Sequence, residues 1–147
     1  VLADFVARRV DGLAEPVAAN REGLRDDLMA LDARAEEIGA AVSGTVLATH
    51  PVYAYFARAY GLTIESLEWE PGAMPTADQW DALAALQADT CATLMLWEAA
   101  PPDAAIARAS EMGLASVVFP PLASPPATGD FLSVMSASLD ALEAAAR

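Results

Sequence analysis

Short apolar runs alternate with amphipathic stretches across residues 45–146, and this alternation constrains the fold more than any other feature. The runs have the length of β-strands, and the stretches between them have the three- and four-residue spacing of helices. Strands that alternate with helices are typical of a parallel sheet with helices on both faces. We therefore predict an α/β fold with a four-stranded, mostly parallel sheet in the order 2-1-3-4, flanked by helices. The expected strands are 45–49, 64–69, 92–97 and 115–119, and the expected helices are 51–60, 76–86, 101–112 and 129–146.

The first forty residues read as a long helical segment that precedes the sheet. Apolar residues recur at helical spacing from Leu2 to Leu13 and again from Leu24 to Ile38. Pro16 is expected to interrupt the helix, because a proline disfavours the helical conformation of the residue before it. The sequence thus predicts two parts, a helical segment at 1–42 and an α/β lobe at 43–147.

Composition narrows the classes of partner. The formal net charge is −13, and every basic residue is an arginine. Such a chain repels phosphate backbones and anionic lipid, so we expect no nucleic-acid partner. No apolar run is long enough to span a bilayer, and a single cysteine, Cys91, excludes an internal disulfide. The chain begins at Val1, so we expect a processed start or a piece of a longer protein.

Chemistry-bearing residues follow the predicted strands. His50 comes after the first strand, Glu70 closely after the second, Glu98 after the third and Pro120 after the fourth. Ligands of open α/β sheets bind at the carboxyl ends of the strands. In the order 2-1-3-4, His50 and Glu98 follow neighbouring strands, which lie roughly 5 Å apart. An imidazole beside a carboxylate suits zinc, manganese or iron, and the remaining ligands would come from outside this segment or from water.

Plainer interpretations of the same residues stay open. His50 could serve only as a hydrogen-bonding residue at a helix N-terminus, and Glu98 as a solvated loop acid. Trp69 and Trp97 are expected to be packing residues, and Cys91 a small buried residue at the start of the third strand. The phosphate-binding glycine motifs and the G-x-S-x-G motif are absent, and without lysine Schiff-base chemistry is excluded. We therefore predict that the chain is not an enzyme, and rank a metal-assisted hydrolase with Glu70 as base last.

The segment that contains His50 resembles a known family. Thr49-His50-Pro51, followed by Tyr55-Phe56-Ala57 and Tyr60-Gly61-Leu62, resembles a motif of the TroA-like zinc and manganese solute-binding proteins of ABC importers. The resemblance covers nearly the whole chain. It continues in order through Glu68-Trp69-Glu70-Pro71, Met74-Pro75, Trp80, Leu96-Trp97-Glu98, Val117-Val118-Phe119 and Gly129 to Met135.

This resemblance carries expectations about architecture and site. Members of the family have two α/β lobes joined by a long rigid helix, and hold the metal between the lobes. The chain looks like the joining helix with the C-terminal lobe, without the N-terminal lobe that supplies two histidine ligands. By resemblance His50 matches the third histidine ligand, and Glu98 a ligand or near-ligand carboxylate. Pro120 occupies the usual position of an aspartate ligand, and Asp130 is expected to cap the last helix instead.

Together these observations predict a transport receptor rather than a catalyst. The expected function is the C-terminal lobe of a periplasmic protein that captures a divalent metal, zinc first and manganese second, for an ABC permease. The alternative, which Pro120 favours, is a degenerate interaction module that keeps the fold and binds no metal. A homodimer is one option for covering a lobe face that lacks its partner.

Overall fold

The computed structural model describes residues 2–147, and Val1 lies outside the described residues. The chain divides into two compact units, Val1–Arg34 and Ala35–Arg147, which are described separately. The division into a helical segment at 1–42 and a lobe at 43–147 stays a prediction about domains. Within the part of the chain that the structure describes, no helix combines the length and apolarity that a membrane span requires.

The first unit consists of helix α1 (Leu2–Arg9) and the first part of helix α2 (Ala14–Ala41). The expected interruption at Pro16 is wrong, because Pro16 lies in the first turn of α2. Backbone N–H groups in a first turn have no acceptor within the helix, so a proline costs little there. The chain turns instead between α1 and α2, where Gly12 adopts a φ of 80° that favours glycine.

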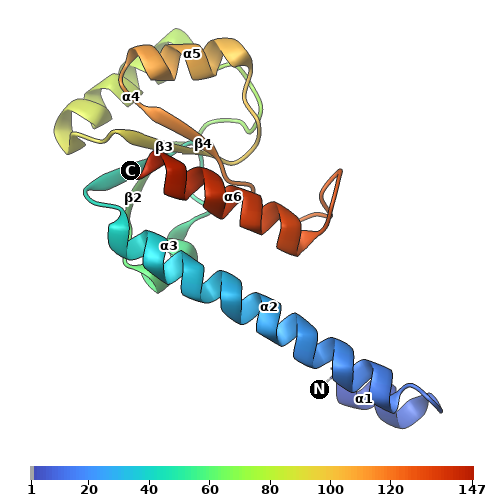
Figure 1. The fold of residues 1–147 in the computed structure, drawn as a ribbon. Helices are drawn as coiled ribbons and strands as arrows, with labels where there is room; N and C mark the ends of the chain where they lie inside the picture. Colours follow the sequence, from blue (N-terminus) through green and yellow to red (C-terminus); the bar gives the residue numbers. More distant parts are fainter. Residues whose placement is uncertain (1) are drawn as a thin grey trace. The chain divides into compact units, whose positions relative to one another are not determined.

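The second unit contains the predicted sheet. Its strands are β1 (Thr45–Ala48), β2 (Thr63–Ser66), β3 (Leu94–Trp97) and β4 (Ala115–Val118). All neighbours pair in parallel, and the order is β2-β1-β3-β4 (Figure 1), which confirms the prediction. Val46, Leu47 and Ala48 are fully buried, as expected for a central strand without a polar face.

Four helices complete this unit: α3 (Ala54–Tyr60), α4 (Ala77–Thr90), α5 (Asp103–Glu111) and α6 (Phe131–Ala145). Side chains cap two of them, and the cap at Asp130 confirms the prediction. The Thr76 hydroxyl accepts a hydrogen bond from the Gln79 backbone N–H at the start of α4. Asp130 accepts one from the Ser133 backbone N–H, 2.8 Å away, at the start of α6.

Helix α3 begins later than expected, because Pro51 and Val52 belong to a turn. The Val52 N–H donates to the His50 carbonyl oxygen at 2.9 Å, and the helix starts only at Ala54. The turn lies between the end of β1 and α3, so His50 stands in a loop at the edge of the sheet.

Three tryptophans organise the core on one face of the sheet. The Trp69 ring centroid lies 5.2 Å from that of Trp80 and 5.8 Å from that of Trp97. These rings pack with Leu47 and Met95 of the sheet and with buried residues of α4 and α5, which lie on the same side (Figure 1). Trp69 and Trp97 are therefore packing residues, as predicted. Helix α6 contacts β4 on the other side of the sheet.

The prediction for Cys91 is wrong. Helix α4 continues to Thr90, and Cys91 is its C-cap in the left-handed conformation, with a φ of 55°. Its side chain is exposed instead of buried. Strand β3 begins only at Leu94, and it is therefore shorter than the strand expected at 92–97.

Candidate functional site

The carboxyl ends of β1 and β3 place His50 and Glu98 at the same edge of the sheet. The strands pair with Ala48 opposite Leu96, and His50 and Glu98 each come two residues after this last pair. The Thr49 N–H extends the pairing by donating to the Leu96 carbonyl oxygen at 2.9 Å. The two residues therefore follow the ends of adjacent strands, as expected from the strand order.

The His50 ring is oriented by a backbone carbonyl of the segment that follows β2. Its Nδ1 lies 3.2 Å from the Trp69 carbonyl oxygen. Because a carbonyl oxygen only accepts, Nδ1 carries the proton in this bond, and a neutral ring keeps its lone pair on Nε2. Metal-binding histidines are commonly oriented by such a bond. His50 is half-buried. Its ring contacts the Trp69 carbonyl oxygen, which differs from the plainer interpretation of His50 as a hydrogen-bonding residue at a helix N-terminus.

The backbone N–H of Glu98 forms a hydrogen bond, whereas one of its carboxylate oxygens does not. Its backbone N–H donates to the Thr49 hydroxyl oxygen at 3.2 Å. Its Oε2 is buried and has no hydrogen-bond partner among the residues that the structure describes. A buried carboxylate oxygen without a donor is costly unless a cation or a proton compensates it. Glu98 is therefore not a fully solvated loop acid.

Tyr53 is a site neighbour that the sequence argument did not identify. Its ring is buried, and its hydroxyl donates to the Phe119 carbonyl oxygen at 2.7 Å. Burial, with a smaller contribution from the negative charge of Glu98, raises the pKa of Tyr53 well above its ordinary value of 10.0. The phenol is therefore a neutral donor that ties the loop after β1 to the end of β4. Its place three residues after His50 in the recognised segment was the available signal.

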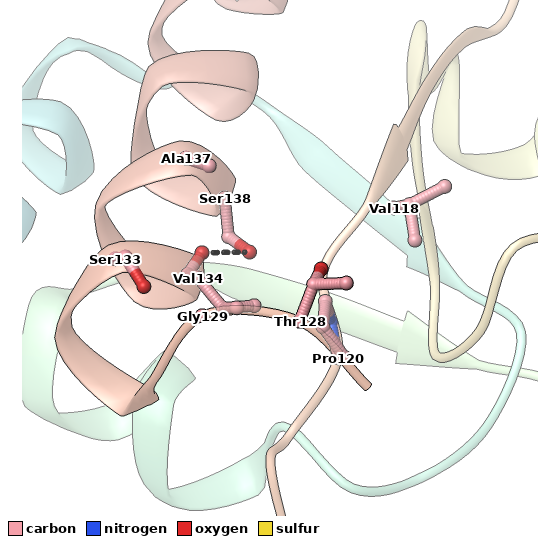
Figure 2. A pocket seen from close by; sticks show the side chains of 8 residues that line it. All are labelled: Val118, Pro120, Thr128, Gly129, Ser133, Val134, Ala137 and Ser138. Carbon is pink, nitrogen blue, oxygen red and sulfur yellow. Dashed lines mark hydrogen bonds between the residues drawn. The ribbon is translucent and has the colours of Figure 1, made fainter. Parts of the chain in front are cut away.

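The position after β4 carries no ionisable side chain. Pro120 lines a hollow between the end of β4 and the first turns of α6, which Figure 2 shows from close by. The Ser138 hydroxyl, also on this lining, donates to the Val134 carbonyl oxygen of its own helix. The remaining lining residues are Val118, Thr128, Gly129, Ser133 and Ala137. The hollow thus offers hydroxyls and apolar surface, but no carboxylate or imidazole.

The described residues contain no group of three or more histidine, cysteine, aspartate or glutamate side chains placed to hold a metal ion. Glu70, at the same edge after β2, is exposed. At this edge the loops that follow two adjacent strands carry one imidazole, on His50, and one carboxylate, on Glu98, as candidate ligands. A complete coordination shell around them needs ligands from water or from another part of a larger assembly.

Comparisons with known proteins agree with this architecture. Zn(II)-bound AdcA from Streptococcus pneumoniae is 23% identical, with a TM-score of 0.77 over 97% of this chain and 32% of that one. The metal-dependent lipoprotein YcdH from Bacillus subtilis is 17% identical, with a TM-score of 0.80 over 97% of this chain and 57% of that one. The periplasmic zinc-binding protein TroA from Treponema pallidum is 18% identical, with a TM-score of 0.70 over 98% and 57%. At these identities the likeness shows the fold.

The chain spans between about a third and 57% of the length of these solved structures. No curated protein sequence matches it. The model of a protein family described as zinc-uptake complex component A, periplasmic (ZnuA), matches residues 8–145. That range covers nearly the whole sequence, so the chain belongs to the ZnuA family, as its resemblance to TroA-like proteins indicates.

Proposed function

We propose that this chain is the C-terminal lobe of a periplasmic solute-binding protein that captures a divalent metal ion for an ABC importer. Zinc is the proposed cargo, with manganese as the second candidate. His50 would bind through Nε2 and Glu98 through its carboxylate. The family match over residues 8–145 and the zinc-bound state of AdcA support this proposal.

One observation carries the proposal. His50 and Glu98 share one sheet edge, and each offers a side-chain atom that suits a cation. The His50 Nδ1 bond to Trp69 leaves Nε2 as the ligand atom, and Glu98 Oε2 is buried without a partner in the described part of the chain. Zinc accepts an imidazole nitrogen and a carboxylate oxygen at comparable distances of about 2.0–2.2 Å.

The mechanism would be capture and release, without bond chemistry. The formal charge of −13 raises the local concentration of cations around the lobe. His50 and Glu98 would supply half of a four-ligand shell, and an N-terminal lobe that this sequence does not contain would supply the rest. The permease would receive the ion when the two lobes separate slightly.

Competition with a chromogenic zinc chelator tests the proposal on the 147-residue chain. We expect zinc binding by the unaltered chain, none by His50→Ala, and weaker binding by Glu98→Gln. Glu70→Gln is the matched control, because Glu70 is an exposed carboxylate at the same edge. Equal zinc binding by all four proteins would contradict the proposed site.

The second candidate function is an interaction module that has lost metal binding. Pro120 favours it, since proline offers no side-chain ligand where the family resemblance expects aspartate. Absence of zinc binding by the unaltered chain would support this candidate. Hydrolysis with Glu70 as base is not retained, because the family is one of solute-binding transport proteins and Glu70 lies exposed.

A further inference from the structure

Thr49, directly after β1, makes three hydrogen bonds to the ends of the two neighbouring strands, β2 and β3. Its N–H donates to the Leu96 carbonyl oxygen of β3 at 2.9 Å. Its carbonyl oxygen accepts from the Trp69 N–H, beyond β2, at 2.8 Å. Its hydroxyl oxygen accepts from the Glu98 N–H at 3.2 Å. Thr49 is only 3% exposed, so these bonds form away from water.

These contacts govern the placement of both candidate ligands. His50 is the next residue in the chain, and its ring is oriented by the carbonyl of Trp69, whose N–H is held by Thr49. Glu98 is held directly, through its backbone N–H. The hydroxyl of Thr49 is thus a side-chain link between the loop that carries the imidazole and the loop that carries the carboxylate.

The link between the two loops needs a hydroxyl oxygen at position 49, and a side chain of the same shape without that oxygen cannot form it. Valine would fill the same buried space and keep both backbone bonds, but would leave the Glu98 N–H without this acceptor. Burial of a hydroxyl is unfavourable unless it is hydrogen-bonded, so the bond to Glu98 offsets the cost of a buried threonine. Serine would retain the acceptor oxygen and lose only a methyl group.

We infer that Thr49 is a positioning residue, whose hydroxyl holds Glu98 beside His50 so that both reach one cation. The inference rests on the proposed metal-binding function. Residues that orient metal ligands typically change metal affinity about 10- to 100-fold when they are replaced. A residue that only stabilised the fold would affect stability without this effect on the site.

The first test needs no metal. Amide hydrogen exchange of the Glu98 N–H is measured by NMR in the unaltered chain, Thr49→Val and Thr49→Ser. The matched control is Thr90→Val, because the Thr90 hydroxyl donates to the Leu86 carbonyl oxygen within α4. We expect at least about fivefold faster exchange in Thr49→Val only, from a typical hydrogen-bond contribution of about 1 kcal/mol. Unchanged exchange in Thr49→Val would overturn the inference.

The second test measures zinc affinity of the same four proteins by chelator competition. We expect Thr49→Val to bind at least about tenfold more weakly, and Thr49→Ser and Thr90→Val to bind like the unaltered chain. Unweakened binding by Thr49→Val would overturn the inference. If Thr49→Val does not fold, by circular dichroism, Thr49→Ala replaces it in both tests. If the unaltered chain binds no zinc, the proposed function fails, and the exchange result alone decides whether Thr49 holds Glu98.

Discussion

Replacing Tyr53 with phenylalanine removes one buried hydrogen bond and little else. The Tyr53 hydroxyl donates to the Phe119 carbonyl oxygen at 2.7 Å, and both residues are almost fully buried. The ring itself packs edge-on against the Phe119 ring, with centroids 6.2 Å apart and an interplanar angle of 82°. Tyr53→Phe preserves this ring contact and deletes only the donor.

The expected loss of stability follows from the Phe119 carbonyl oxygen, which stays buried but loses its donor in Tyr53→Phe. A buried carbonyl left without its donor costs about 1–3 kcal/mol, more than the net value of a typical hydrogen bond. We therefore expect the free energy of unfolding of Tyr53→Phe to fall by about 1–3 kcal/mol at neutral pH. Tyr55→Phe is the matched control, because Tyr55 is 80% exposed and should change the free energy of unfolding very little.

The change of stability with pH in alkali provides a second, independent test of the same hydrogen bond. Burial first, and then the charge of Glu98, raises the pKa of Tyr53 above its ordinary value of 10.0. The unfolded chain therefore ionises this phenol before the folded chain does. Its contribution to stability is complete below pH 10.0 and is lost as the pH rises beyond it, by at most about 1.4 kcal/mol per pH unit.

Urea denaturation at several pH values from 7 to 11 measures both effects. The unaltered chain and Tyr55→Phe should lose stability above pH 10.0, and Tyr53→Phe should lose less over the same range. The reasoning is refuted if Tyr53→Phe is as stable as the unaltered chain at neutral pH and falls as steeply in alkali.

Two further substitutions test local features of the fold. Gly39→Ala should destabilise the chain in thermal unfolding, because a Cβ there would lie 2.3 Å from the Tyr60 carbonyl oxygen. Gly23→Ala is the control, because Gly23 lies in the same helix with open space around it, and this change should stabilise the chain by up to about 1 kcal/mol. Equal effects of the two substitutions would contradict the packing argument. Asp130→Asn should keep the cap of α6 but weaken the acid dependence of stability: hydrogen bonds from Ser133 lower the pKa of Asp130, so its stabilisation is present above pH 3.8 and is lost below it. Urea denaturation between pH 2 and 6 would show this, and identical acid profiles for both proteins would count against it.

The strand order was predictable because parallel strands and their connections leave few arrangements. Apolar runs marked the strands, and the fully apolar Val46–Ala48 marked a central one. From the order alone, His50 and Glu98 could be assigned to neighbouring strand ends, where the structure places them. The assignment of these residues as metal ligands stays a prediction.

Other features depended on context that a sequence pattern does not carry. Pro16 looked like an interruption, but its effect depends on its position within the first turn of α2. Cys91 adopts a left-handed conformation that residues other than glycine seldom adopt, and nothing in the sequence indicates it. The apolar residues that follow Cys91 indicated a strand instead. The hydrogen bond between Thr49 and Glu98 joins residues 49 positions apart, and no local pattern reveals such a bond.

The strands of this sheet are four residues long, which amounts to about 13 Å of extended chain. The tryptophan cluster secures that short scaffold from one side, whereas His50, Glu98 and Pro120 lie beyond the strand ends. A substitution at this rim can therefore change which side chains surround a ligand while the packed interior of the sheet stays the same. Pro120 is an example, because it places no ionisable side chain at the rim, whereas the four strands and the tryptophan core behind it are complete.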